Sequence, residues 1–206
     1  MTIIPIKTPV TVTEVHAKPA AEPNKAPAGV SHINSLHPTS PLSTTAPIVP
    51  VAPVKRTLTE HIVWHVTATP EGREFNAKDI DRMHRQEGWQ CIGYHYIIKL
   101  DGTVESGRPE DIVGAHVLNF NHNTIGISCV GGVTNDGKIT PKDTRTPAQI
   151  ATQIALTKDI LTRYPHATVA GHRDFPHQNR ACPCFDAIPY AKAHGLPAGF
   201  AAGQPR

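Results

Sequence analysis

The stretch HIVWHVTAT, residues 61–69, decides the fold expected of this 206-residue chain. Apolar and β-branched residues dominate it, which is typical of a strand buried within a sheet. The strand is expected to end near His65, where small residues take over. A side chain at the end of a buried strand is held by the sheet and still reaches solvent, so His65 is a candidate for a functional site.

Strand and helix patterns are mixed in the residues that follow. The turn pair Asp101-Gly102 within GYHYIIKLDGTVESGR predicts a hairpin. The other predicted elements are a helix over 75–89, strands over 123–132 and 167–172, a long helix over 146–165 and a short helix over 186–195. This mixture predicts an α/β (α+β) fold in which a mixed central β-sheet is flanked by helices.

Both longer helices have clear start signals. Asn76 is followed three residues later by Asp79, and Thr146 is followed by Pro147 and Gln149. Each pattern is typical of a helix that begins with a capping box. The apolar spacing of the second helix predicts an inward stripe made of Ile150, Ile154, Leu161 and Tyr164.

The first 56 residues differ in composition from the rest. They contain no Phe, Trp or Tyr, and they hold half of the chain's 20 prolines. Such a segment cannot bury enough apolar surface to offset the entropy lost on ordering. Residues 1–56 are therefore predicted to be a disordered, Pro-rich flexible tail or linker, residues 57–196 a folded domain and residues 197–206 a flexible C-terminus.

Charge and hydropathy exclude several classes of partner. The formal net charge is +3 at pH 7, and no basic run marks a nucleic-acid-binding surface. No stretch is long and apolar enough for an integral membrane segment. The first residues, MTIIPIKTPVTVTEV, lack the basic start, unbroken apolar core and cleavage site of a secretory signal. Without export, the cysteines are expected to be reduced thiols or metal ligands rather than disulfides.

Three potential metal ligands stand out by position. His65 follows one predicted strand, His172 ends another, and Cys182 comes ten residues after His172 within NRACPCFD. Two neutral imidazoles and one thiolate suit a tetrahedral zinc ion with an open fourth position. The alternative is that each residue has a separate structural role, and spacing alone leaves that alternative open. The common H-E-x-x-H and paired C-x-x-C zinc signatures do not occur in the sequence.

A resemblance to a known family favours the metal interpretation. Its motifs are HIVWHVTAT, RMHRQEGWQCIGYHYIIKLDGTVESGR, GAHVLNFNHNTIGISCVGG, TPAQ, GHRD and ACPCFD. Together and in this order they resemble the zinc-dependent N-acetylmuramoyl-L-alanine amidases, a family of phage T-seven lysozyme-like endolysins that includes the peptidoglycan recognition proteins. The resemblance covers about 57–194 and leaves the tail uncovered. It implies a mixed sheet flanked by helices, with zinc in a surface cleft.

The resemblance also implies a ligand set. His65 in HVTAT, His172 in GHRD and Cys182 in ACPCFD match the positions of the family's zinc ligands, which implies one Zn²⁺ per chain. Cys184 stands at a variable position of the last motif.

Three further residues receive roles from the resemblance. Tyr94 in GYHY and Arg180 are implied catalytic residues, and Arg180 stands where the phage enzymes carry a lysine. A guanidinium can stabilise an oxyanion by charge, but its pKa is too high for it to shuttle protons. His116 in GAHV is implied to bind substrate at the rim of the cleft.

The implied reaction is hydrolysis of the amide between N-acetylmuramic acid and L-alanine in peptidoglycan. Residues 57–196 would then be the amidase catalytic domain of a phage or prophage endolysin for host cell lysis. Without a signal peptide, such an enzyme is expected in the host cytoplasm and acts on the cell wall after release.

Other functions are open at this point. A non-lytic peptidoglycan-binding module is one alternative, and a bacterial cell-wall amidase or toxin with the same chemistry is another. The phage T-seven relative also restrains an RNA polymerase through a region near its N-terminus. This chain has a long tail in place of that region, so RNA polymerase inhibition is not supported.

Overall fold

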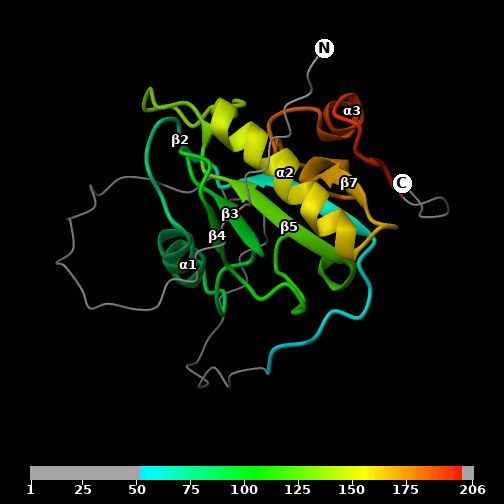
Figure 1. Cartoon of the computed structure of the whole chain (residues 1–206). Coiled ribbons are helices and arrows are strands. Elements are labelled where there is room, and N and C mark those ends of the chain that lie inside the picture. The colour runs from blue at the N-terminus through cyan, green and yellow to red at the C-terminus, as the bar shows by residue number, and fades with distance from the viewer. Residues whose placement is uncertain (1–51, 201–206) are drawn as a thin grey trace, which may run out of the picture. The chain divides into compact units, whose positions relative to one another are not determined.

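The structure is a computed structural model that describes residues 52–200 (Figure 1). Most of the predicted tail, residues 1–56, lies outside the described residues, as do residues 201–206 of the predicted C-terminus. The predicted domain, residues 57–196, is described throughout.

A five-stranded sheet with the order β4-β3-β5-β1-β7 forms the centre of the domain (Figure 1). Strand β1 lies between β5 and β7 and is parallel to both, β3 is parallel to β5, and β4 is antiparallel to β3. The bounds are β1 His61–Val66, β3 Tyr96–Ile98, β4 Val104–Ser106, β5 Thr124–Cys129 and β7 Thr168–Gly171. A separate parallel pair consists of β2 Thr69–Pro70 and β6 Gly132–Val133. The predicted mixed central sheet and the hairpin at Asp101-Gly102 are confirmed.

Helices flank this sheet, as predicted. Helix α2 crosses one face of the sheet, and α3 packs beside the edge strand β7 (Figure 1). The bounds are α1 Ala77–Gln86, α2 Pro147–Arg163 and α3 Ala187–Ala193, with short 3-10 helices at Asn121–Asn123 and His172–Asp174. Both predicted capping boxes are present, at the start of α1 and at the start of α2.

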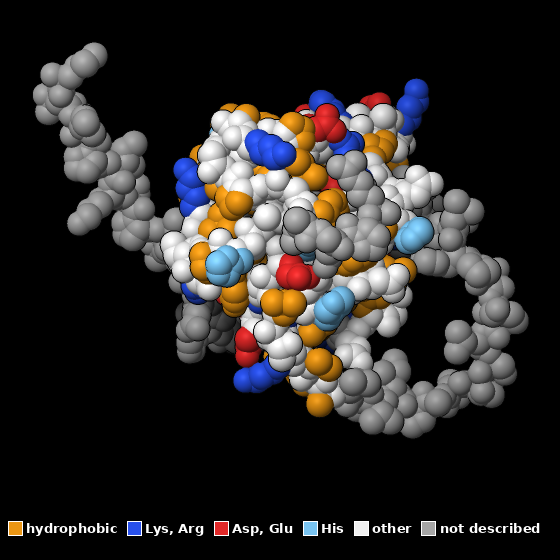
Figure 2. Space-filling model, turned by 90° about the vertical axis from the view of Figure 1, so that its right-hand side faces the viewer, with side chains coloured by type: hydrophobic (Ala, Val, Ile, Leu, Met, Phe, Trp, Pro, Cys, Tyr) orange, Lys and Arg blue, Asp and Glu red, His pale blue; other side chains and the backbone are white. Residues whose placement is uncertain are grey.

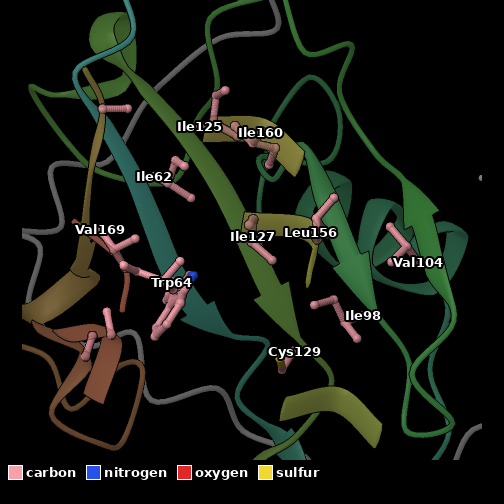
Figure 3. Packing of buried hydrophobic residues seen from close by; sticks show 14 residues of the cluster. Ile62, Trp64, Ile98, Val104, Ile125, Ile127, Cys129, Leu156, Ile160 and Val169 are labelled. Atoms are coloured by element: carbon pink, nitrogen blue, oxygen red, sulfur yellow. The ribbon is translucent and has the colours of Figure 1, made fainter. Parts of the chain in front are cut away.

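Alternate side chains of β1 point to opposite faces of the sheet. Ile62 and Trp64 lie in the main core, where they meet Leu156 and Ile160 of α2 (Figure 3). Val63 belongs to a different buried cluster. The alternation that buries Trp64 against α2 therefore directs the neighbouring side chain of His65 to the opposite face.

The buried face of α2 is more polar than the predicted stripe. All four residues of that stripe are partly exposed. Leu161 and Tyr164 pack against the core as predicted, whereas Ile150 and Ile154 belong to none of the buried clusters, so the prediction is wrong for these two. The buried residues of the helix are Gln149, Gln153, Leu156, Thr157 and Ile160. Apolar spacing misses this face because polar side chains can be buried when they find hydrogen-bond partners.

Gln149 links α2 to the sheet. Its Nε2 donates to the carbonyl oxygens of Ile98 and Val130, at 3.0 Å and 2.9 Å. Its Oε1 accepts the backbone N–H of Thr146 at 3.0 Å. The residue is 0% exposed, so water cannot replace these bonds.

Segments on both sides of residues 57–196 are hydrogen-bonded to the domain. The backbone N–H of Arg56 donates to the carbonyl of Asp111 at 2.6 Å, and that of Gly199 donates to the carbonyl of Val169 at 2.9 Å. The predicted domain boundaries stay a prediction.

The described surface carries mixed charge. On the face shown in Figure 2, acidic and basic side chains are scattered and do not gather into a large patch of one sign. Within residues 52–200, no helix is both long enough and apolar enough to cross a membrane.

We predict that Gln149→Leu lowers the free energy of unfolding by roughly 2 kcal/mol. The Val130 carbonyl and the Thr146 N–H lose their bonds to Gln149, and the Ile98 carbonyl keeps only the bond from the Val130 N–H. Ile150→Ala is the matched control, and it should cost less because Ile150 is partly exposed. Equilibrium unfolding in urea measures both changes. A larger loss for Ile150→Ala than for Gln149→Leu would contradict the assigned face of α2.

Candidate metal centre

The pairing of β1 with β7 brings two histidines together. In the parallel register Trp64 lies opposite Gly171, so His65 and His172 come next at the same edge of the sheet. Their ring centroids are 4.7 Å apart. The carboxyl ends of neighbouring parallel strands are where open α/β sheets bind ligands.

Cys182 approaches these histidines from a loop. Its carbonyl accepts the backbone N–H of Arg173 at 2.9 Å, which ties the loop to the turn after β7. Its Sγ accepts the backbone N–H of Val66 at 3.4 Å and lies 3.7 Å from Nδ1 of His65. The sulfur is therefore held at the end of β1.

The three side chains form a donor set that fits a zinc ion. One donor atom from each of His65, His172 and Cys182 lies within 4.8 Å of the others, and these three residues are called the cluster below. A tetrahedral zinc ion bound to an imidazole nitrogen and a thiolate sulfur holds these atoms roughly 3.6 Å apart. The separation of 3.7 Å between Sγ and Nδ1 is close to that value. Three ligands of this kind leave a fourth position for water or substrate.

The two cysteines of ACPC have different surroundings. Cys182 belongs to the cluster, whereas the thiol of Cys184 donates to the carbonyl of Gly132 at 3.3 Å. All four cysteines of the chain are free. The Cys182 thiol is therefore free to act as a ligand.

Burial keeps the three cluster side chains neutral in the absence of a cation. It lowers the pKa of His65 well below its usual value, and His172 lowers it further. Burial also lowers the pKa of His172 to about 4. The same cause raises the pKa of the Cys182 thiol to about 12. At pH 7 both imidazoles are ready to bind a metal, and the thiol still has to lose its proton.

Tyr94 lies beside the cluster, and its ring centroid is 5.1 Å from that of His65. Burial raises the pKa of its hydroxyl above the usual value, and Cys182 adds to the effect. The hydroxyl is therefore protonated at neutral pH and can donate a hydrogen bond. The catalytic role of Tyr94 stays a prediction.

Arg180 is exposed in the loop that carries Cys182. Burial is the main reason that the pKa values of His65 and His172 are low, and the positive charge of Arg180 lowers both pKa values further. The guanidinium therefore acts electrostatically on the cluster. Its catalytic role also stays a prediction.

His116 lies beneath His65. It is 6% exposed, and its Nδ1 is 3.0 Å from Nε2 of His65. On the other side of the cluster, Nε2 of His172 is 3.1 Å from Oε1 of Gln178. Metal-binding histidines commonly have such partners on the second ring nitrogen. The substrate contact expected of His116 stays a prediction.

Arg145 supports the loop of Cys182, and no sequence motif marks it. Its side chain is 1% exposed, and its guanidinium carbon lies 3.3 Å from the ring centroid of Phe185. It forms a two-bond pair with Asp143, each bond 2.9 Å long, and donates to Gln153 of α2 at 2.9 Å. A single arginine next to a helix cap gives no signal of burial, so only the structure identifies this support.

Comparison with known proteins decides the family. Residues 55–185 match the family model described as N-acetylmuramoyl-L-alanine amidase. The chain belongs to this amidase family. The resemblance found in the sequence is confirmed, and the chain is an N-acetylmuramoyl-L-alanine amidase.

Phage, animal and bacterial proteins are similar to this amidase. It is 40% identical to an endolysin of Enterobacteria phage T3 over 131 residues, which are 64% of this chain and 84% of that protein. It is 32% identical to peptidoglycan recognition protein 1 of Bos taurus over 124 residues, or 59% of this chain and 63% of that protein. The solved structure of the endolysin amidase LysCS from Clostridium intestinale matches with a TM-score of 0.55 and 30% identity, covering 69% of this chain and 86% of that chain. These likenesses confirm the predicted fold class.

We predict that a zinc ion entering the cluster of this amidase releases about one proton at pH 6, where a zinc-bound water with a pKa of about 7 keeps most of its protons. Both histidines are already neutral, whereas the pKa of the Cys182 thiol is about 12, so the proton comes from that thiol. Calorimetric titration in two buffers with different ionisation enthalpies measures the number released, and Cys182→Ala should release none. Release of no proton, or of two, by the unmodified chain would contradict the assigned protonation states.

Proposed function

We propose that this amidase cleaves the bond between N-acetylmuramic acid and L-alanine in peptidoglycan with one zinc ion held by His65, His172 and Cys182. The observation that carries the proposal is the meeting of these three side chains, with donor atoms within 4.8 Å, at the carboxyl ends of β1 and β7. The family match over residues 55–185 supports the bond that is cut.

The chain's own residues supply distinct parts of the chemistry. When bound, zinc lowers the pKa of a water molecule toward neutrality and polarises the scissile carbonyl. The Tyr94 hydroxyl, whose pKa is raised by burial, stays protonated and donates to the oxyanion of the tetrahedral intermediate. Arg180 adds positive charge at the same oxyanion, and its guanidinium does not give up a proton at neutral pH.

The proposal includes a role as a phage or prophage endolysin. Identity of 40% to the phage T3 endolysin, over 84% of that protein, supports this role. The partner is then peptidoglycan, which the enzyme reaches after release from the host cytoplasm. A bacterial wall amidase or toxin would use the same residues for the same reaction.

Binding of peptidoglycan without cleavage is the second candidate function. The likeness to a peptidoglycan recognition protein favours it. The presence of Cys182 beside both histidines favours hydrolysis, because a module that only binds needs no zinc-ligating thiol.

Cys182→Ser is expected to abolish turnover while the fold persists, because a neutral hydroxyl is a poor zinc ligand compared with a thiolate. The assay measures the free L-alanine amino groups that appear when peptidoglycan is cleaved, and it checks that no new reducing sugar ends are formed. Cys184→Ser is the matched control and should stay active, since Cys184 lies outside the cluster. Full activity of Cys182→Ser with normal circular dichroism would refute the ligand assignment.

Arg180→Ala is expected to lower kcat by roughly 100-fold, in line with the loss of one oxyanion partner, with a smaller change in KM. Arg180→Lys should keep most of the activity, because the charge is retained. Arg82→Ala, which removes an exposed arginine on α1, is the control and should leave kcat unchanged. A lysine variant many times faster than the unmodified enzyme would show that proton donation, rather than charge, is needed at this position.

A further inference from the structure

A chain of hydrogen bonds begins at Nε2 of His65, the ring nitrogen that points away from Cys182. Nδ1 of His65 faces Sγ of Cys182 at 3.7 Å, and Nε2 lies 3.0 Å from Nδ1 of His116. The two imidazole rings are nearly perpendicular, at 88°. The two ring nitrogens of His65 therefore have different partners: Nδ1 faces Cys182 and Nε2 faces His116.

The contacts of His116 fix the direction of this chain. Nε2 of His116 lies 3.4 Å from Oγ1 of Thr124. The Thr124 hydroxyl donates its own proton to the carbonyl of Phe120 at 2.8 Å, so its oxygen is free to accept. His116 then carries its proton on Nε2, and its Nδ1 accepts from Nε2–H of His65. This direction leaves Nδ1 of His65 without a proton on the side of Cys182.

The fold makes room for the His116 ring. A Cβ atom on Gly126 of β5 would lie 2.8 Å from Nδ1 of His116, and one on Gly114 would lie 2.4 Å from Cδ2. Both distances are shorter than real contacts of this kind, so both glycines are needed for the ring to occupy this place. The Asn121 side chain adds a second restraint, because its Oδ1 accepts the backbone N–H of His116 at 2.7 Å.

We propose that His116 is a positioning residue that holds His65 in the Nε2–H tautomer and directs its bare Nδ1 at the metal. This inference rests on the proposed function, because it takes His65 as a zinc ligand. It assigns to His116 a role in metal affinity that is separate from substrate contact. Zinc-bound histidines are oriented in this way by acceptors on the second nitrogen, and loss of such a partner weakens binding by roughly 10- to 100-fold.

Zinc affinity of the full chain, measured by competition with a chromophoric chelator, tests this role. His116→Ala should weaken zinc binding by roughly 10- to 100-fold. His116→Asn should recover most of the affinity, because its amide oxygen can replace Nδ1 as an acceptor. His61→Ala is the matched control: it removes a buried histidine of β1 that lies outside the cluster, and it should leave zinc affinity unchanged.

Nitrogen NMR of the zinc-free chain supplies a second readout that a purely structural role would not move. The unmodified chain should show His65 protonated on Nε2, and His116→Ala should show both tautomers. Unchanged zinc affinity in a folded His116→Ala variant, or an Nδ1–H tautomer of His65 in the unmodified chain, would overturn the inference. Failure of the unmodified chain to bind zinc would instead overturn the proposed function on which the inference rests.

Discussion

The parallel pairing of β1 with β7 is the constraint on which the rest of the structure depends. It places His65 beside His172, and it does so only in the register that sets Trp64 opposite Gly171. A slip of one residue would turn every side chain of β1 to the other face of the sheet. Trp64 prevents such a slip, because it is buried against α2 and its indole N–H donates to Thr157 at 3.0 Å. The hydrophobic core and the candidate metal centre thus depend on alternate residues of one strand.

The candidate metal centre gathers polar groups where water is largely excluded. Removing imidazoles and a thiol from water carries a cost unless each finds hydrogen-bond partners. The partners here are His116 for His65, Gln178 for His172 and the Val66 N–H for Cys182. The same burial that imposes the cost keeps the histidines unprotonated, which is the form that binds a metal. The site is therefore organised before a cation arrives, and only Cys182 must change its protonation state.

Local signals in the sequence predict most of the fold, and family motifs predict the site. Capping boxes, a turn pair and apolar strand runs act over a few residues, so they can be recognised without tertiary structure. Spacing alone left the metal interpretation open, and the ordered motifs were needed to select Cys182 over Cys184. The polar face of α2, the support of Phe185 by Arg145 and the place of His116 under His65 were not predictable. Each depends on contacts between distant segments, such as Gln149 with the carbonyls of Ile98 and Val130.

The proposed zinc site of this amidase consists of His65, His172 and Cys182. X-ray absorption at the zinc edge of the zinc-loaded full chain tests it most directly. Zinc held by these residues should have one sulfur neighbour at about 2.3 Å and two imidazole nitrogens at about 2.0 Å, with one further light atom in the fourth position. A spectrum without a sulfur neighbour, or with two, would contradict this assignment.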